Sequence, residues 1–140
     1  MAGFSIDLSQ KLLDAAFGGT AYTPVVTHFV RIYTVMPIAD GTGGTEATGG
    51  GYAALSVTNN GTNWTASTAA SPAVKKNATA FTWPAATGDW SANTDLVGYA
   101  IWSLASGGVM LDFGTFDFAR RIRLNDIMNL PIASVTITLG

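Results

Sequence analysis

The chain has 140 residues, a length typical of one domain, and we expect a single domain over residues 1–140. Hydrophobic residues make up 48% of the chain and charged residues only 11%, which excludes intrinsic disorder because disordered chains are poor in apolar residues and rich in charge. The formal net charge of −2 offers no basic surface, so we expect no nucleic-acid partner.

Residue types that build metal and catalytic sites are scarce. Cysteine is absent, which excludes disulfides and thiolate ligands, and His28 is the only histidine. We therefore expect no metal and no other cofactor. The first residues lack the basic start of a secretory signal, and no apolar stretch approaches the roughly 20 residues that span a bilayer. We expect a soluble protein with no membrane partner, made in a cytoplasm.

An amphipathic helix is predicted within residues 1–19. Ser5 or Asp7 can cap its start, and Gly18-Gly19 can end it because glycine tolerates the left-handed conformation found at helix ends. Apolar residues recur at a spacing of three and four, namely Leu8, Leu12, Leu13, Ala16 and Phe17. A helix of about a dozen residues is marginal alone, so this stripe must pack on its own domain or on another subunit.

The chain from residue 25 onward has the pattern of β-strands separated by loops rich in small residues. The predicted elements of its first half are a strand at Thr27–Val35, a glycine-rich loop at 39–51, a strand at 52–58, a polar segment at 62–77, a strand at 79–83 and a loop at 85–95.

The second half contains the more apolar strands. Those at 96–104 and 109–116 are joined by Ala105-Ser106-Gly107-Gly108, which has the length and composition of a hairpin loop. A short strand pair is predicted at 120–124 and 127–130. Polar and apolar residues alternate over 134–139, as in a strand with one buried face. We expect Val135, Ile137 and Leu139 to point to the core.

Roughly seven or eight short strands with frequent turns predict a mainly β fold. We expect an antiparallel β-sandwich or jelly-roll-like domain over residues 25–140, preceded by one short N-terminal α-helix.

Candidate catalytic residues do not form a coherent set, so we expect no enzyme. His28 lies within a strand and is expected at a surface or an interface. Asp112 and Asp117 flank a strand and could form a glycosidase pair, but charged strand residues usually face solvent. Asp40 and Glu46 lie in the glycine-rich loop, but their spacing does not fit a calcium loop.

Two further groups of residues could contact a partner. Trp64, Trp83 and Trp90 lie in or near loops, where we favour loop anchoring over a sugar-binding surface. The only basic cluster is formed by Arg120, Arg121 and Arg123. It either binds an acidic patch on a protein partner or forms an ordinary solvated edge.

An ordered set of motifs runs along nearly the whole chain. It begins with Leu12-Leu13-Asp14-Ala15-Ala16-Phe17-Gly18-Gly19-Thr20-Ala21-Tyr22-Thr23-Pro24 and continues with Gly49-Gly50-Gly51-Tyr52-Ala53, Phe81-Thr82-Trp83-Pro84, Ser106-Gly107-Gly108 and the terminal Val135-Thr136-Ile137-Thr138-Leu139. In these motifs the chain resembles a family of small tailed-phage virion structural proteins, which includes capsid cement and tail-fibre-type members. It departs from the family at Asn125-Asp126, where relatives often carry a glycine–acid turn.

The resemblance implies a virion protein without catalytic residues, synthesised in the bacterial host cytoplasm. Our leading expectation is a cement or decoration protein on the capsid surface, bound to the major capsid protein as a homo-oligomer, with a trimer as the expected state. The alternatives are a tail-fibre or baseplate component and a carbohydrate-binding module. We expect the interface at the helix stripe and the basic cluster, that is at Leu8, Leu12, Leu13, Phe17, Arg120, Arg121 and Arg123.

Overall fold

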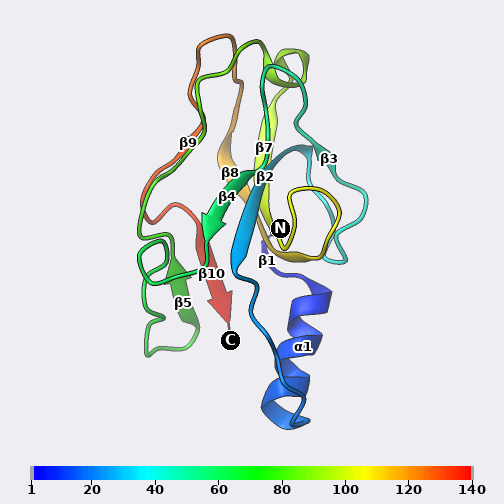
Figure 1. The fold of residues 1–140 in the computed structure, drawn as a ribbon, viewed down its shortest axis with the longest axis vertical. Coiled ribbons are helices and arrows are strands. Elements are labelled where there is room, and N and C mark those ends of the chain that lie inside the picture. The colour runs from blue at the N-terminus through cyan, green and yellow to red at the C-terminus, as the bar shows by residue number, and fades with distance from the viewer. Residues whose placement is uncertain (1, 140) are drawn as a thin grey trace.

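An antiparallel sheet forms the centre of the computed structural model, which describes residues 2–139 (Figure 1). Its strands lie in the order β1 (Gly3–Phe4), β8 (Met110–Arg120), β7 (Leu96–Trp102), β2 (Thr27–Val35) and β3 (Thr45–Glu46), and β4 (Leu55–Thr58) also pairs with β2. The start of β2 pairs with β4 and its end with β3, so one long strand organises two short neighbours.

Two smaller antiparallel pairs complete the β structure. They join β5 (Ala73–Lys76) to β10 (Thr136–Leu139) and β6 (Phe81–Thr82) to β9 (Asn129–Leu130). A short 3₁₀ segment, η1, spans Trp90–Asn93, and the helix α1 spans Ile6–Phe17 at one end of the molecule (Figure 1).

The central sheet is buried on both faces. Val30 and Ile32 of β2 lie in the larger core, together with Phe81, Leu130 and other residues of the smaller pairs. The opposite face holds a second cluster of Tyr33, Ala100, Trp102, Met110 and Phe113. Burial on both faces explains why β7 and the first half of β8 are apolar at almost every position, with Asp112 as the exception. The predicted fold class, a mainly β, sandwich-like domain with one short helix, is confirmed.

The predicted strand pair at 120–124 and 127–130 is wrong. β8 continues to Arg120, and the backbone of both following segments bonds to residues 83–90 instead of forming a strand pair. The amide of Trp83 donates to the carbonyl of Met128 at 2.9 Å, and the amide of Trp90 donates to the carbonyl of Ile122 at 2.9 Å. The partner of β9 is therefore β6, far away in sequence.

Two other expectations need correction. The polar segment at 62–77 contains the strand β5, and Trp64 within it is fully buried. The alternation at the end of the chain holds for Val135, which is buried, and fails at Leu139, which is exposed because β10 pairs only with β5.

The helix α1 has 12 residues, and no helix within residues 2–139 is long and apolar enough to cross a membrane.

Candidate functional site

The N-terminal helix is fixed in place by its first turn and by a glycine at its end. Ser5 is the N-cap, and its hydroxyl oxygen accepts a hydrogen bond from the amide of Leu8 at 3.1 Å. At the other end the amides of Gly18 and Thr20 both donate to the carbonyl of Asp14, and Gly19 between them has a φ of +68°. The helix therefore ends at Phe17, which leaves that ring on its last turn.

The predicted apolar stripe of α1 divides into a buried and an exposed part. Leu8 is only 9% exposed and belongs to the core of its own chain, so its predicted place on an exposed stripe is wrong. Leu12 is half-buried against that core. Leu13 and Phe17 are 59% and 89% exposed, as expected of an interface. Three large apolar side chains of one helix, Ile6, Leu13 and Phe17, thus remain exposed within the described chain.

A groove runs along this exposed part of the helix. It has a volume of about 310 Å³ and is lined by Phe4, Ser9, Leu12, Leu13, Ala16, Phe17 and Leu139. Leu139 comes from β10, so the groove is formed where the two ends of the described chain meet. We call this feature the helix groove. Its lining is almost entirely apolar, which suits the burial of an apolar partner surface.

The three arginines of the predicted basic cluster do not act together. Arg120 is half-buried, donates to the carbonyl of Asn129 at 2.7 Å, and lies 4.9 Å from the ring centroid of Phe116. Arg121 forms an exposed ion pair with Asp95, with 2.5 Å between Nε and Oδ1.

The third arginine has a weaker contact. Arg123 donates from Nε to the side-chain oxygen of Asn93 at 3.3 Å. Each guanidinium of the basic cluster therefore already contacts its own chain, which is the arrangement expected of a solvated edge.

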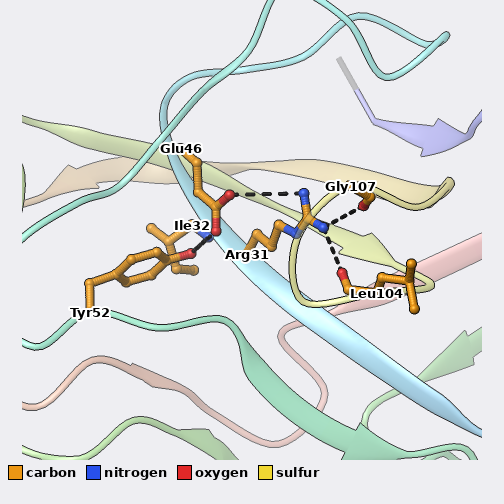
Figure 2. A network of polar contacts seen from close by, with 6 residues as sticks. All are labelled: Arg31, Ile32, Glu46, Tyr52, Leu104 and Gly107. Carbon is orange, nitrogen blue, oxygen red and sulfur yellow. Dashed lines mark hydrogen bonds and ion pairs between the residues drawn. The ribbon is translucent and has the colours of Figure 1, made fainter.

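A buried arginine that sequence reasoning missed holds several loops together (Figure 2). Arg31 of β2 is 5% exposed, and its Nη2 donates to the carbonyls of Leu104 and Gly107, each at 2.6 Å. Its Nη1 lies 3.9 Å from a carboxylate oxygen of Glu46, and the guanidinium lies 4.3 Å from the ring centroid of Trp102. This side chain fixes the β7–β8 hairpin loop to the centre of the sheet.

The same network continues to the glycine-rich loop. The hydroxyl of Tyr52 donates to Glu46 at 2.8 Å and accepts from the amide of Ile32 at 2.9 Å (Figure 2). Burial raises the pKa of Tyr52 far above its ordinary range, so the hydroxyl stays protonated and remains a donor. The only sequence signal for this network was a charged residue within an otherwise apolar strand.

The loop tryptophans are buried anchors. Trp64, Trp83 and Trp90 are each at most 3% exposed. The indole N–H of Trp83 donates to the carbonyl of Ala53 at 2.9 Å, and that of Trp90 donates to the carbonyl of Gly50 at 3.2 Å. Loop anchoring is confirmed, and the exposed rings that motivated a sugar-binding surface are absent at these positions.

The candidate acids lie apart from one another. Asp112 is 2% exposed, so its predicted position in solvent is wrong, whereas Asp117 is exposed. Asp40 accepts two hydrogen bonds from Thr42, which fold the loop on itself. Within residues 2–139 no group of three histidine or acidic side chains lies close enough to hold a metal ion.

Comparison with known proteins shows to which family the chain belongs. The family described as Podophage GP4 fiber I protein gp80 matches residues 3–138, which include every helix and nearly every strand residue described above. The chain belongs to this family. A comparison with curated proteins finds no match.

Membership of this podophage fibre family confirms the resemblance to tailed-phage virion structural proteins. The chain is a structural protein of a phage virion. The match includes α1, so the helix groove is part of the family's domain and not an addition to it.

Proposed function

We propose that this chain is a fibre-type component of the phage tail, acts without catalysis, and enters the virion as a homo-oligomer that assembles through the helix groove. The observation that carries the proposal is the exposure of Leu13, Phe17 and Leu139 beside one groove. The description of the family as a fibre protein supports the place in the tail.

Energetics support the groove as the point of attachment. Covering a leucine or phenylalanine side chain contributes roughly 1.5–3 kcal/mol. Leu13, Phe17 and Leu139 lie at one site, so a partner that covers them gains several times the energy of a single contact. The basic cluster adds little, because each of its guanidinium groups already contacts its own chain and Arg121 already forms an ion pair.

A second copy of the chain is the proposed occupant of the helix groove. Phe17 itself lines the groove and is 89% exposed, so the apolar patch of one copy can cover the same patch of another. Copies related by a closed rotational symmetry bring such patches together at the symmetry axis. We propose a homo-oligomer, with three copies as the state to be tested by sedimentation velocity. A monomer at high concentration would contradict it.

Capsid cement is the second candidate. Charged residues make up only 11% of the chain, which suits a surface largely covered by neighbours, and the major capsid protein would then be the partner. Here the copies would bridge capsid subunits and stabilise the closed shell by the area they bury. The low charge suits a fibre packed between tail proteins equally well, and the family description favours the tail.

Imaging of virions distinguishes the two places. Particles with and without the protein are compared by cryo-electron microscopy, and their resistance to heat is measured in parallel. The tail proposal predicts a density difference at the tail and unchanged capsid resistance. A difference on the capsid surface, with a loss of heat resistance, would overturn it in favour of cement.

A further inference from the structure

A second concave site, which shares Phe4 with the helix groove, lies between the central sheet, α1 and the β5–β10 pair. It is a half-open cavity of about 180 Å³. Asp112 of β8 lines it, and in the register of the sheet this residue lies between Phe4 of β1 and Ile101 of β7, which line the cavity too. Asp112 is 2% exposed, and both of its carboxyl oxygens lie in the wall of the cavity with almost no accessible surface.

Three polar side chains of this cavity have no hydrogen-bond partner among the described residues. They are Asp112, through both carboxyl oxygens, Trp64, through Nε1, and His28, through Nδ1, and all of these atoms are buried. His28 and Trp64 contact each other edge to face, with 5.5 Å between ring centroids. Buried polar groups in native proteins are almost always paired. The carboxylate of Asp112 and an unprotonated Nδ1 of His28 can accept hydrogen bonds from an occupant, whereas the indole N–H of Trp64 is a donor and needs an acceptor, which a cation does not provide.

The chemistry of the cavity selects a cation with a short apolar stem. A carboxylate only accepts hydrogen bonds, and an ammonium group only donates them. The aromatic residues Phe4, Tyr22, His28 and Trp64 also line the cavity, and aromatic faces attract ammonium groups. The volume equals that of about six waters at roughly 30 Å³ each, which admits a stem of a few carbons.

We propose that this cavity binds a primary alkylammonium group, with Asp112 as the opposite charge. The group can belong to a free amine or to a lysine side chain of a neighbouring virion chain, since both present the same chemistry. Nothing in this proposal depends on the occupant of the helix groove.

The charged and titratable groups around Asp112 leave room for such a cation. Lys75 of β5 lines the cavity, but its ammonium group donates to the carbonyl of Thr65 at 2.6 Å. Burial lowers the pKa of His28, which therefore stays neutral. Tyr99 of β7 and Tyr22 are the remaining titratable neighbours, and burial raises the pKa of Tyr99. No charge within the described chain is paired with Asp112.

The protonation state of Asp112 makes binding at this site depend on pH. Burial raises the pKa of Asp112 to about 8, so the carboxyl group of the free protein is protonated at neutral pH. A bound ammonium group stabilises the carboxylate and lowers that pKa. Binding therefore releases a proton. Below pH 8 the affinity for the ammonium group increases up to about tenfold for each unit by which the pH is raised.

Titration with n-butylammonium chloride tests the proposal. The full chain is titrated at several pH values while the indole N–H signal of Trp64 is followed by NMR, with n-butanol as the neutral analogue. We expect a saturable shift with butylammonium that strengthens as the pH rises, and at least tenfold weaker binding of butanol. Equal binding of butanol, or no saturable shift, would overturn the proposal.

Variants and the carboxyl signal give independent readouts. Asp112→Asn is expected to lose butylammonium binding at least tenfold, whereas Asp117→Asn, an exposed acid of the same strand, is expected to keep it. Should Asp112→Asn not fold, the carbon-13 carboxyl signal of Asp112 in the unaltered chain still reports its pKa, which butylammonium must lower. An unchanged pKa, or binding retained by Asp112→Asn, would contradict the proposal.

The source of the ammonium group follows from virion incorporation of Asp112→Asn. Reduced incorporation supports a lysine of a neighbouring chain, and normal incorporation supports a free amine. Ordered waters that fill the cavity in a crystal and stay in place with butylammonium would overturn both.

Discussion

Arg31 is the residue on which the hairpin loop between β7 and β8 depends. Its guanidinium replaces water at two loop carbonyls and lies against Trp102, all within a buried position. We expect Arg31→Met to lower the free energy of unfolding by about 2–4 kcal/mol, because hydrogen bonds to a charged group are lost and Glu46 keeps no cation nearby. Urea denaturation measures this.

Arg121→Met is the matched control, since it removes an exposed ion pair. Its expected cost is at most about 1 kcal/mol. Equal losses in the two variants would show that the Arg31 network does not hold the loops.

Asp112 makes stability depend on pH. Its pKa of about 8 in the folded protein lies above the roughly 3.9 of an unfolded chain, so between these values the folded state binds more protons. Stability is therefore full at low pH and falls as the pH rises from about 4 to 8, because the carboxylate must then form in a buried site. We expect the stability of Asp112→Asn not to fall in this range. At pH 8 the loss in free energy of unfolding, relative to pH 4, is expected to be a few kcal/mol smaller in Asp112→Asn than in the unaltered chain. The free energy of unfolding is measured against pH for both proteins in amine-free buffer. Parallel curves would contradict the raised pKa of Asp112.

Neither residue could be placed from the sequence. A charged residue in a strand faces solvent or core according to the strands beside it, and the neighbours of Asp112 come from β1 and β7. A bulge in the pairing of β7 with β8 shifts the register next to Asp112 and Met110. Counting alternate positions therefore fails there.

At the scale of elements, the helix depends on its cap. Ser5 is buried, and its hydroxyl satisfies the amide of Leu8. We expect Ser5→Ala to cost about 1 kcal/mol and to speed hydrogen exchange of that amide. Ser9→Ala is the control, because the hydroxyl of Ser9 donates to a carbonyl that the helix already uses. Similar exchange rates in the two variants would contradict the capping role.

Elements with local signals were predicted well. Thr27–Val35 has its predicted bounds, and the hairpin of β7 and β8 has its predicted loop. β5 was missed, and the strand predicted at 127–130 was given the wrong partner, because the partners of β5 and β9, β10 and β6, lie far away in sequence. The helix stripe was predicted as a whole, but which of its residues face the sheet depends on how the helix packs.

At the scale of the whole molecule, the structure accounts for the low fraction of charged residues. The central sheet is buried on both faces, which accounts for much of the apolar content. Exposed apolar side chains lie at α1 and at the end of β8, where Phe118 is 83% exposed, and also in connecting segments, for example Val26 and Ile132. Composition indicated a covered surface, and only the fold shows where an apolar groove is available.

The most direct test of the account is the incorporation of Phe17→Ser into virions, measured by quantitative mass spectrometry of purified particles. Phe118→Ser is the matched control, because it removes an equally exposed ring from a different surface. If the helix groove holds the chain in the virion, Phe17→Ser protein folds normally and its copy number falls at least tenfold, while Phe118→Ser is incorporated as the unaltered chain is. Normal incorporation of Phe17→Ser would contradict the account.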